Sequence, residues 1–197
     1  MAEAFFQATA WTMDTPKPYG AFHLVLTVLG VSLSIFLARK FSFPERKAGP
    51  DTILFLCGLF LGLTELYKQG FIYYIENDRT YDWWYFPFQL CSVPMYLGLF
   101  IPMVPARIRN VFYLFIQDFG LLGGIMALAE PSGLMHPYWT MTVHGFLWHF
   151  NLIFMGLICA FYNLKTETPK SYLHTIPLFL FCTAIATAVN VLSHPYG

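Results

Sequence analysis

One cysteine and two histidines are the side chains of this sequence best suited to covalent chemistry. Cys91 lies in an apolar stretch between Pro87 and Pro94, and His144 and His149 lie in a later one. An imidazole can take the proton of a thiol and leave a thiolate nucleophile. Each proline removes a backbone donor, so we expect the helix around Cys91 to be distorted toward a cavity. These residues predict a polar pocket with a Cys–His pair.

The two histidines are five positions apart, which is about 140° around a helix. We therefore expect only one of them to face Cys91, and the spacing does not decide which. The alternative is that Cys91 has no chemical role and packs as a small hydrophobic residue, as membrane cysteines usually do.

Further polar side chains fall within apolar stretches, where an ionisable group costs about 2.5–3.5 kcal/mol on insertion scales and should face the interior of a bundle. Glu65 and Lys68 are three positions apart and could neutralise each other, either as a structural ion pair or as part of a site. Asp118 could equally be a carboxylate that binds a neighbouring helix. The predicted substrate-binding residues are Glu65, Lys68, Gln89, His23, Asn190, Asp118 and His144.

The elements that must hold these residues are membrane-spanning helices. Of the 197 residues, 57% are hydrophobic and 11% are charged, which is too apolar for the surface of a soluble domain. A spanning helix needs about 20 apolar residues. Six blocks qualify: 19–41, 53–75, 85–104, 108–128, 140–162 and 172–192. The fold class predicted is all-α, one polytopic bundle of six transmembrane helices over residues 1–197, with a short interfacial segment at 1–18.

Basic residues predict the orientation, because lysine and arginine concentrate in cytoplasmic loops. Eight lie in alternate links, and only Lys17 and Arg79 lie on the other side. The eight are Arg39, Lys40, Arg46, Lys47, Arg107, Arg109, Lys165 and Lys170. Both termini are therefore expected outside, with the polar residues between the midplane and the outer face. A net charge of zero with no basic run argues against a nucleic-acid partner, and nothing in the sequence indicates a metal or another cofactor.

Five short motifs give the chain a family resemblance. They are F-H-L at His23, E-L-Y-K at Glu65 to Lys68, F-P-F-Q-L-C-S ending at Ser92, F-L-W-H at His149 and A-V-N at Asn190. The pattern resembles the bacterial YwaF-like integral membrane proteins and their animal relative, transmembrane protein 164. Gln89 stands where many members have histidine, and His144 is outside the pattern.

The resemblance implies a six-helix fold in a bacterial cytoplasmic membrane and, from the animal branch, a Cys–His acyltransferase acting on phospholipids. On that basis Cys91 is the expected nucleophile and His149 its general base. Acyl transfer or ester cleavage on a phospholipid or fatty-acyl substrate is our first hypothesis. The alternative is a small transporter or ligand-binding protein that uses the polar pocket without covalent chemistry, and a third is a purely structural partner.

The orientation is directly testable. Reporter fusions or cysteine accessibility at the loops of Arg46 and Arg107 should place both loops in the cytoplasm. An external signal from either loop would contradict the predicted topology.

Overall fold

The computed structural model describes residues 2–42, 50–163, 168 and 170–194 of the chain. Within these ranges the regular elements are helices. One isolated β-bridge pairs Thr12 with Tyr138. The basic residues Arg46, Lys47 and Lys165, on which the orientation partly rests, lie outside the described residues.

Among the residues that the structure describes, four helices are long and apolar enough to cross a membrane. They are α2 (Ala21–Ser42), the continuous run Ala106–Ala129, α7 (Trp139–Asn163) and the run Ser171–Ser193. The second run consists of α5 (Ala106–Phe115), the π-helical turn η5 (Ile116–Gly120) and α6 (Leu121–Ala129). The fourth consists of the 3-10 turn η7 (Ser171–Thr175) and α8 (Ile176–Ser193). These helices match four of the six predicted blocks.

The second block forms a long helix that carries charge. It comprises α3 (Asp51–Phe71) and the π-helical turn η1 (Ile72–Glu76). Asp51, Glu65 and Lys68 all lie within it.

The third block, predicted as a helix over residues 85–104, is helical only in its later part. It starts with the 3-10 turn η2 (Trp83–Tyr85), continues through an irregular stretch, and becomes helical again from Leu90 to Met103. That second part consists of η3 (Leu90–Ser92), α4 (Val93–Phe100) and η4 (Ile101–Met103). Pro87 lies in the irregular stretch and Pro94 in the first turn of α4. The predicted distortion around Cys91 is therefore confirmed. It is large enough to interrupt the predicted third helix before Leu90.

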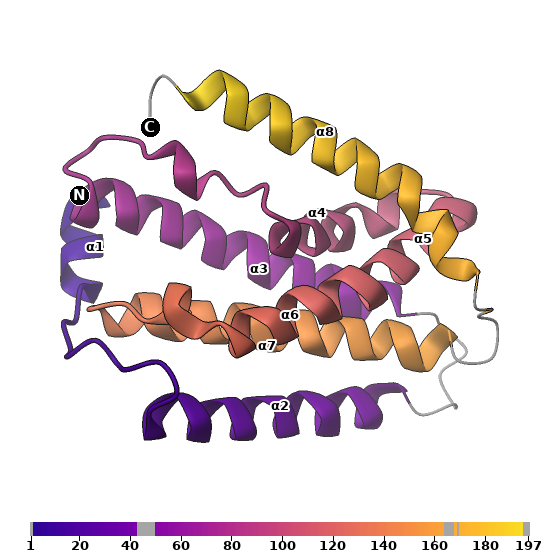
Figure 1. Cartoon of the computed structure of the whole chain (residues 1–197), viewed down its shortest axis with the longest axis horizontal. Helices are drawn as coiled ribbons and strands as arrows, with labels where there is room; N and C mark the ends of the chain where they lie inside the picture. Colours follow the sequence, from indigo (N-terminus) through magenta and orange to yellow (C-terminus); the bar gives the residue numbers. More distant parts are fainter. Residues whose placement is uncertain (1, 43–49, 164–167, 169, 195–197) are drawn as a thin grey trace.

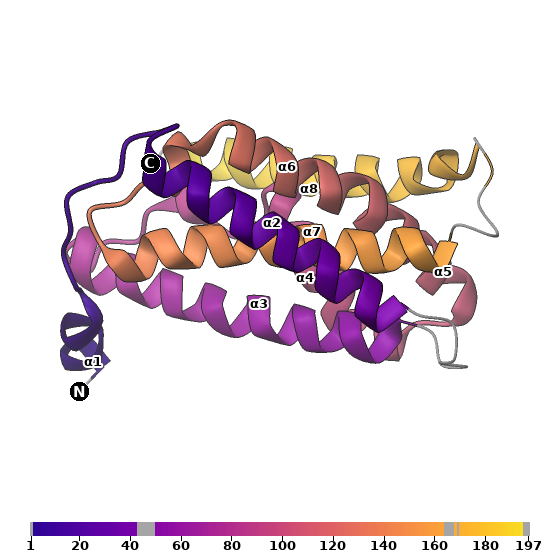
Figure 2. The same cartoon turned by 90° about the horizontal axis from the view of Figure 1, so that it is seen from below.

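Helix α7 is the central element of the bundle, as Figures 1 and 2 show. It contacts α2, α3, α5, η5 and α6. Its buried residues come from nearly every turn and include Trp148, Leu152 and Met155. Helix α8 is the opposite case, because Cys182 is its only buried residue, and it lies along one edge of the molecule (Figure 1). The bundle is therefore tightly packed around α7 and loosely packed at α8.

The predicted interfacial segment includes a short helix, α1 (Ala2–Thr9). It contacts η1, where the ring of Phe6 stacks on Tyr74. The Thr9 hydroxyl is hydrogen-bonded to Tyr67 of α3 at 2.7 Å. Whether this helix lies in a membrane interface stays a prediction.

Glycines allow α3 and α4 to approach at backbone distance. A Cβ atom added to Gly98 would lie 2.6 Å from the carbonyl oxygen of Leu54, and one added to Gly58 would lie 2.7 Å from the amide nitrogen of Leu99. Small residues are the usual means of close helix contact in membranes. This contact fixes the helix that follows Cys91 against α3.

Gly98→Ala should therefore destabilise the protein by about 1–3 kcal/mol, the usual cost of overpacking. Gly133→Ala is the matched control, because an added Cβ would meet nothing within 4 Å there. Unfolding of both variants in detergent measures the difference. Equal stabilities would contradict the close α3–α4 contact.

Candidate active site

A cavity of about 320 Å³ collects most of the residues singled out in the sequence. Among the side chains that line it are Lys68, Gln89, Cys91, His144 and His149. Its walls come from α3, the irregular stretch before η3, the turn after α6, and α7. Residues separated by up to 81 positions thus face one space.

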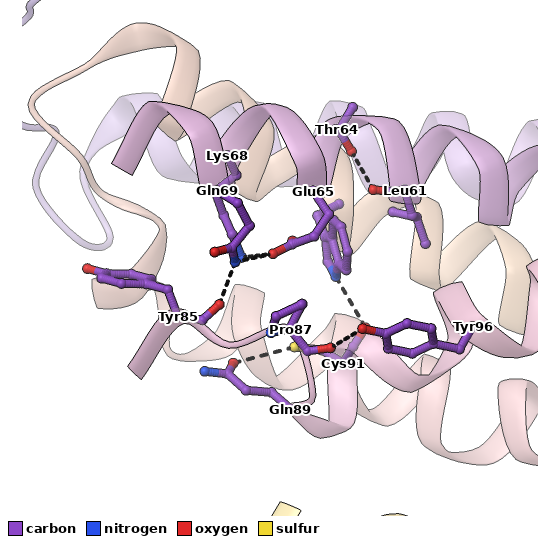
Figure 3. Close-up of polar contacts among 11 residues, drawn as sticks. Leu61, Thr64, Glu65, Lys68, Gln69, Tyr85, Pro87, Gln89, Cys91 and Tyr96 are labelled. Carbon is purple, nitrogen blue, oxygen red and sulfur yellow. Dashed lines mark hydrogen bonds and ion pairs between the residues drawn. The ribbon is translucent and has the colours of Figure 1, made fainter. Parts of the chain in front are cut away.

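Cys91 lies in the 3-10 turn η3, held by contacts on several sides. Its carbonyl oxygen accepts a hydrogen bond from Trp148 Nε1 at 3.2 Å. Its thiol donates to Gln89 Oε1 at 3.8 Å, as Figure 3 shows. A Cβ added to Gly123 of α6 would touch the Cys91 Cβ at 3.6 Å, so α6 packs directly behind the cysteine. Among the described residues, no hydrogen bond joins the thiol to a histidine.

His149 is held in a defined orientation. Its Nδ1 lies 2.7 Å from the carbonyl oxygen of Gly145, one turn earlier in α7. A carbonyl only accepts, so Nδ1 carries the proton and a neutral His149 presents the lone pair of Nε2. That tautomer suits a general base.

His144 lines the same cavity as His149. Both histidines therefore line the cavity that Cys91 lines, and which of them faces the thiol stays a prediction. The cavity follows α7 for more than two turns, from Met141 to His149, so it reaches both sides of the helix. His144 Nε2 is buried without a hydrogen-bond partner among the described residues, and its ring lies 5.5 Å from that of Trp148.

Glu65 is the centre of a polar network beside the cavity. The residue is 4% exposed, and its Oε1 lies 2.8 Å from Lys68 Nζ and 2.7 Å from Gln69 Nε2. The same Gln69 nitrogen donates to the carbonyl oxygen of Tyr85 at 2.6 Å (Figure 3). Glu65 and Lys68 therefore form the predicted pair, and Gln69 connects that pair to the beginning of the Cys91 segment.

The remaining predicted site residues lie elsewhere. His23 is buried between Tyr19 and α6, and its Nε2 bonds the carbonyl oxygen of Leu128 at 3.1 Å. Asp118 lies in η5, where Gln117 Nε2 donates to it at 3.4 Å. Asn190 lines a separate groove under α8. None of the three lines the cavity, because equal depth in the bundle does not mean that helices share a face.

Sequence reasoning missed several residues of the site. Trp148 and Gln69 hold the backbone on either side of the Cys91 segment, and His136 lines the cavity from the turn after α6. Gln69 follows Lys68 directly and Trp148 precedes His149, so position relative to the motifs was the available signal.

Comparison with known families shows which protein family the chain belongs to. The model of the TMEM164 family matches residues 18–194. The chain belongs to the TMEM164 family. Comparisons with curated proteins and with solved structures gave no match.

The TMEM164 match spans α2 to α8 and includes every residue that lines the cavity. It confirms the resemblance to transmembrane protein 164 and, with the four apolar helices, indicates an integral membrane protein. The bacterial branch stays a prediction. Among the described residues, no group of three or more His, Cys, Asp or Glu side chains could hold a metal ion.

The Glu65 network generates a stability prediction for this TMEM164 family member. Lys68→Met leaves a buried carboxylate without its cation and should cost about 3–5 kcal/mol. Adding Glu65→Gln should recover part of that loss, which makes the two changes non-additive. Chemical denaturation of the single and double variants in detergent gives the coupling. Strictly additive losses would contradict a buried ion pair.

Proposed function

We propose that this protein is a membrane-embedded enzyme that transfers or cleaves the acyl group of a phospholipid or another fatty-acyl ester. The observation that carries the proposal is that Cys91 and His149 line one cavity. A thiol and an imidazole with a free ring nitrogen are the two groups that nucleophilic acyl chemistry needs.

The reaction proceeds in two balanced steps. His149 Nε2 takes the thiol proton of Cys91, and the sulfur attacks the ester carbonyl carbon. The C–O bond to the alcohol part of the lipid breaks, and that alkoxide receives the proton from His149. In the second step water or another lipid hydroxyl gives its proton to His149 and attacks the thioester. The acyl group leaves the sulfur, and the departing Cys91 thiolate takes the proton from His149 to restore the thiol.

The resting thiol donates to Gln89 rather than to His149, so the pair must form as substrate enters. Catalytic hydrogen bonds are often long or absent before substrate binds and tighten in the complex. Displacement of the Gln89 amide by the ester would free the thiol to turn toward the imidazole. Gln89 thus holds the thiol until substrate enters the cavity.

Lys68 supplies the positive charge at the cavity. Its ammonium is bound to Glu65 and lies 5.9 Å from the centroid of the Trp148 ring. An ammonium has three donors, so the ion pair with Glu65 leaves capacity for an anion. We assign to Lys68 the stabilisation of the oxyanion that forms on the ester, or of a lipid phosphate.

The full topology is part of the proposal. Four apolar helices, the charged α3 and the shorter helical run Leu90–Met103 make the six crossings. The last is completed by the irregular stretch, which membranes tolerate where backbone lines a cavity. With both termini outside, the cavity lies in the outer half of the bilayer, and substrate enters from the outer leaflet.

One observation favours a second function. The Cys91 thiol bonds an amide oxygen, not a histidine, as it would in a protein that binds a ligand in the same cavity without covalent chemistry. Glu65 and Lys68 would then recognise the ligand. Such a protein would bind lipid and leave it unchanged.

Cys91→Ser separates these functions. It replaces the sulfur by oxygen and should leave folding intact while removing nearly all turnover of a phospholipid ester. Cys57→Ser is the matched control, because Cys57 is also a half-buried thiol but lies outside the cavity. Mass spectrometry of the released or transferred acyl group measures the rate. Full turnover by Cys91→Ser would exclude a thiolate nucleophile and an acyl-thioester as requirements of the reaction.

The choice of histidine has its own test. His149→Ala should lower turnover as far as Cys91→Ser does, because removing either member of a unit removes the unit. His144→Ala should retain most activity. The reverse result would keep the Cys–His pair and make His144 the base.

A further inference from the structure

A second hollow lies between α8 and the segment that carries Cys91. It is a groove of about 420 Å³, within the roughly 300–1,000 Å³ typical of small-ligand sites. One wall is the face of α8 that carries Thr183, Ala186, Thr187 and Asn190, which recur at helical spacing. The opposite wall is the stretch around Phe88.

Most side chains that line the groove are apolar, and its polar side chains, Gln89, Thr183, Thr187 and Asn190, are uncharged. Its floor is apolar and buried, with Val93 3% exposed and Cys182 8% exposed. No charged side chain lines it among the residues that the structure describes. An anionic head group would find no counter-ion there, whereas an alkyl chain needs none.

The groove borders the candidate active site, with the segment before Cys91 between the two hollows. Trp84, Phe86 and Gln89 line both the groove and the cavity. Gln89 is the residue that accepts the hydrogen bond of the Cys91 thiol. A chain lying in the groove would therefore reach Gln89, the residue that bonds the Cys91 thiol.

Because α8 is loosely packed, an alkyl chain can enter the groove beside it. Cys182 is the only buried residue of α8, while Leu180, Phe181 and Val191 are 59–67% exposed. Figure 1 shows α8 along one edge of the molecule. In a bilayer that edge would face lipid tails, the source of the occupant.

We propose that this groove binds the fatty-acyl chain of the lipid whose ester reacts at Cys91. The inference rests on the proposed function and names a subsite for it. A chain moving from lipid into the groove stays in a hydrocarbon environment, so it gains packing and position rather than hydrophobic free energy. The groove therefore selects chains by shape, and the small side chain of Ala186 leaves room for them.

The test is photolabelling of the full-length Cys91→Ser protein in phospholipid vesicles that contain a phospholipid with a diazirine in its acyl chain. Peptide mapping measures the label on residues 179–190 and 83–93. Ala186→Trp fills the groove and should reduce that label about tenfold, a loss in the range set by small misfits in apolar pockets. Ala188→Trp is the matched control, since Ala188 is exposed on the same helix outside the groove.

Thr187→Leu, compared with Ala188→Leu, repeats the test with a smaller change if the tryptophan variant fails to fold. Label that is spread over all lipid-facing helices and equal in groove and control variants would overturn the subsite. This readout needs no turnover, so it is separate from failure of the acyl-transfer proposal. In the protein with Cys91 intact, Ala186→Trp should also shift turnover toward shorter acyl chains, and an unchanged chain preference would count against the groove.

Discussion

The buried carboxylate of Glu65 is the interaction on which the arrangement around Cys91 depends. An unpaired charge is costly in an apolar bundle. Lys68 and Gln69, from the next turn of α3, therefore both bind the Glu65 carboxylate. Gln69 in turn fixes the carbonyl of Tyr85, where the irregular segment begins. One charge on a regular helix thereby positions a stretch of chain that has no regular hydrogen bonding of its own.

The irregular segment creates space that a straight helix would fill. Pro87 prevents helical bonding before Cys91, and Tyr96 compensates by donating to the Pro87 carbonyl oxygen at 2.8 Å (Figure 3). Gly98 then allows α4 to pack closely on α3. The result is a cavity on one side of the segment and, under the loosely packed α8, a groove on the other. Gln89 lies between them.

The apolar blocks predicted the four helices that are long and apolar enough to cross a membrane, because length and composition define such a span. The prolines predicted the break near Cys91, and the i, i+3 spacing predicted the Glu65–Lys68 pair. The sequence did not predict that His23, Asp118 and Asn190 lie outside the cavity of Cys91, because depth along a helix can be counted while the rotation of the helix depends on tertiary packing. The angle between His144 and His149 did not predict that both line this cavity, because the shape of a cavity is set by several elements.

The central claim is that Cys91 carries the acyl group during turnover. The most direct measurement is the intact mass of the protein after brief incubation with a phospholipid ester, followed by peptide mapping. The account predicts a mass increase equal to the acyl group on the peptide that contains Cys91, removed by hydroxylamine as a thioester is. Turnover of the same lipid without any acyl adduct on Cys91, under conditions that trap thioesters, would contradict it.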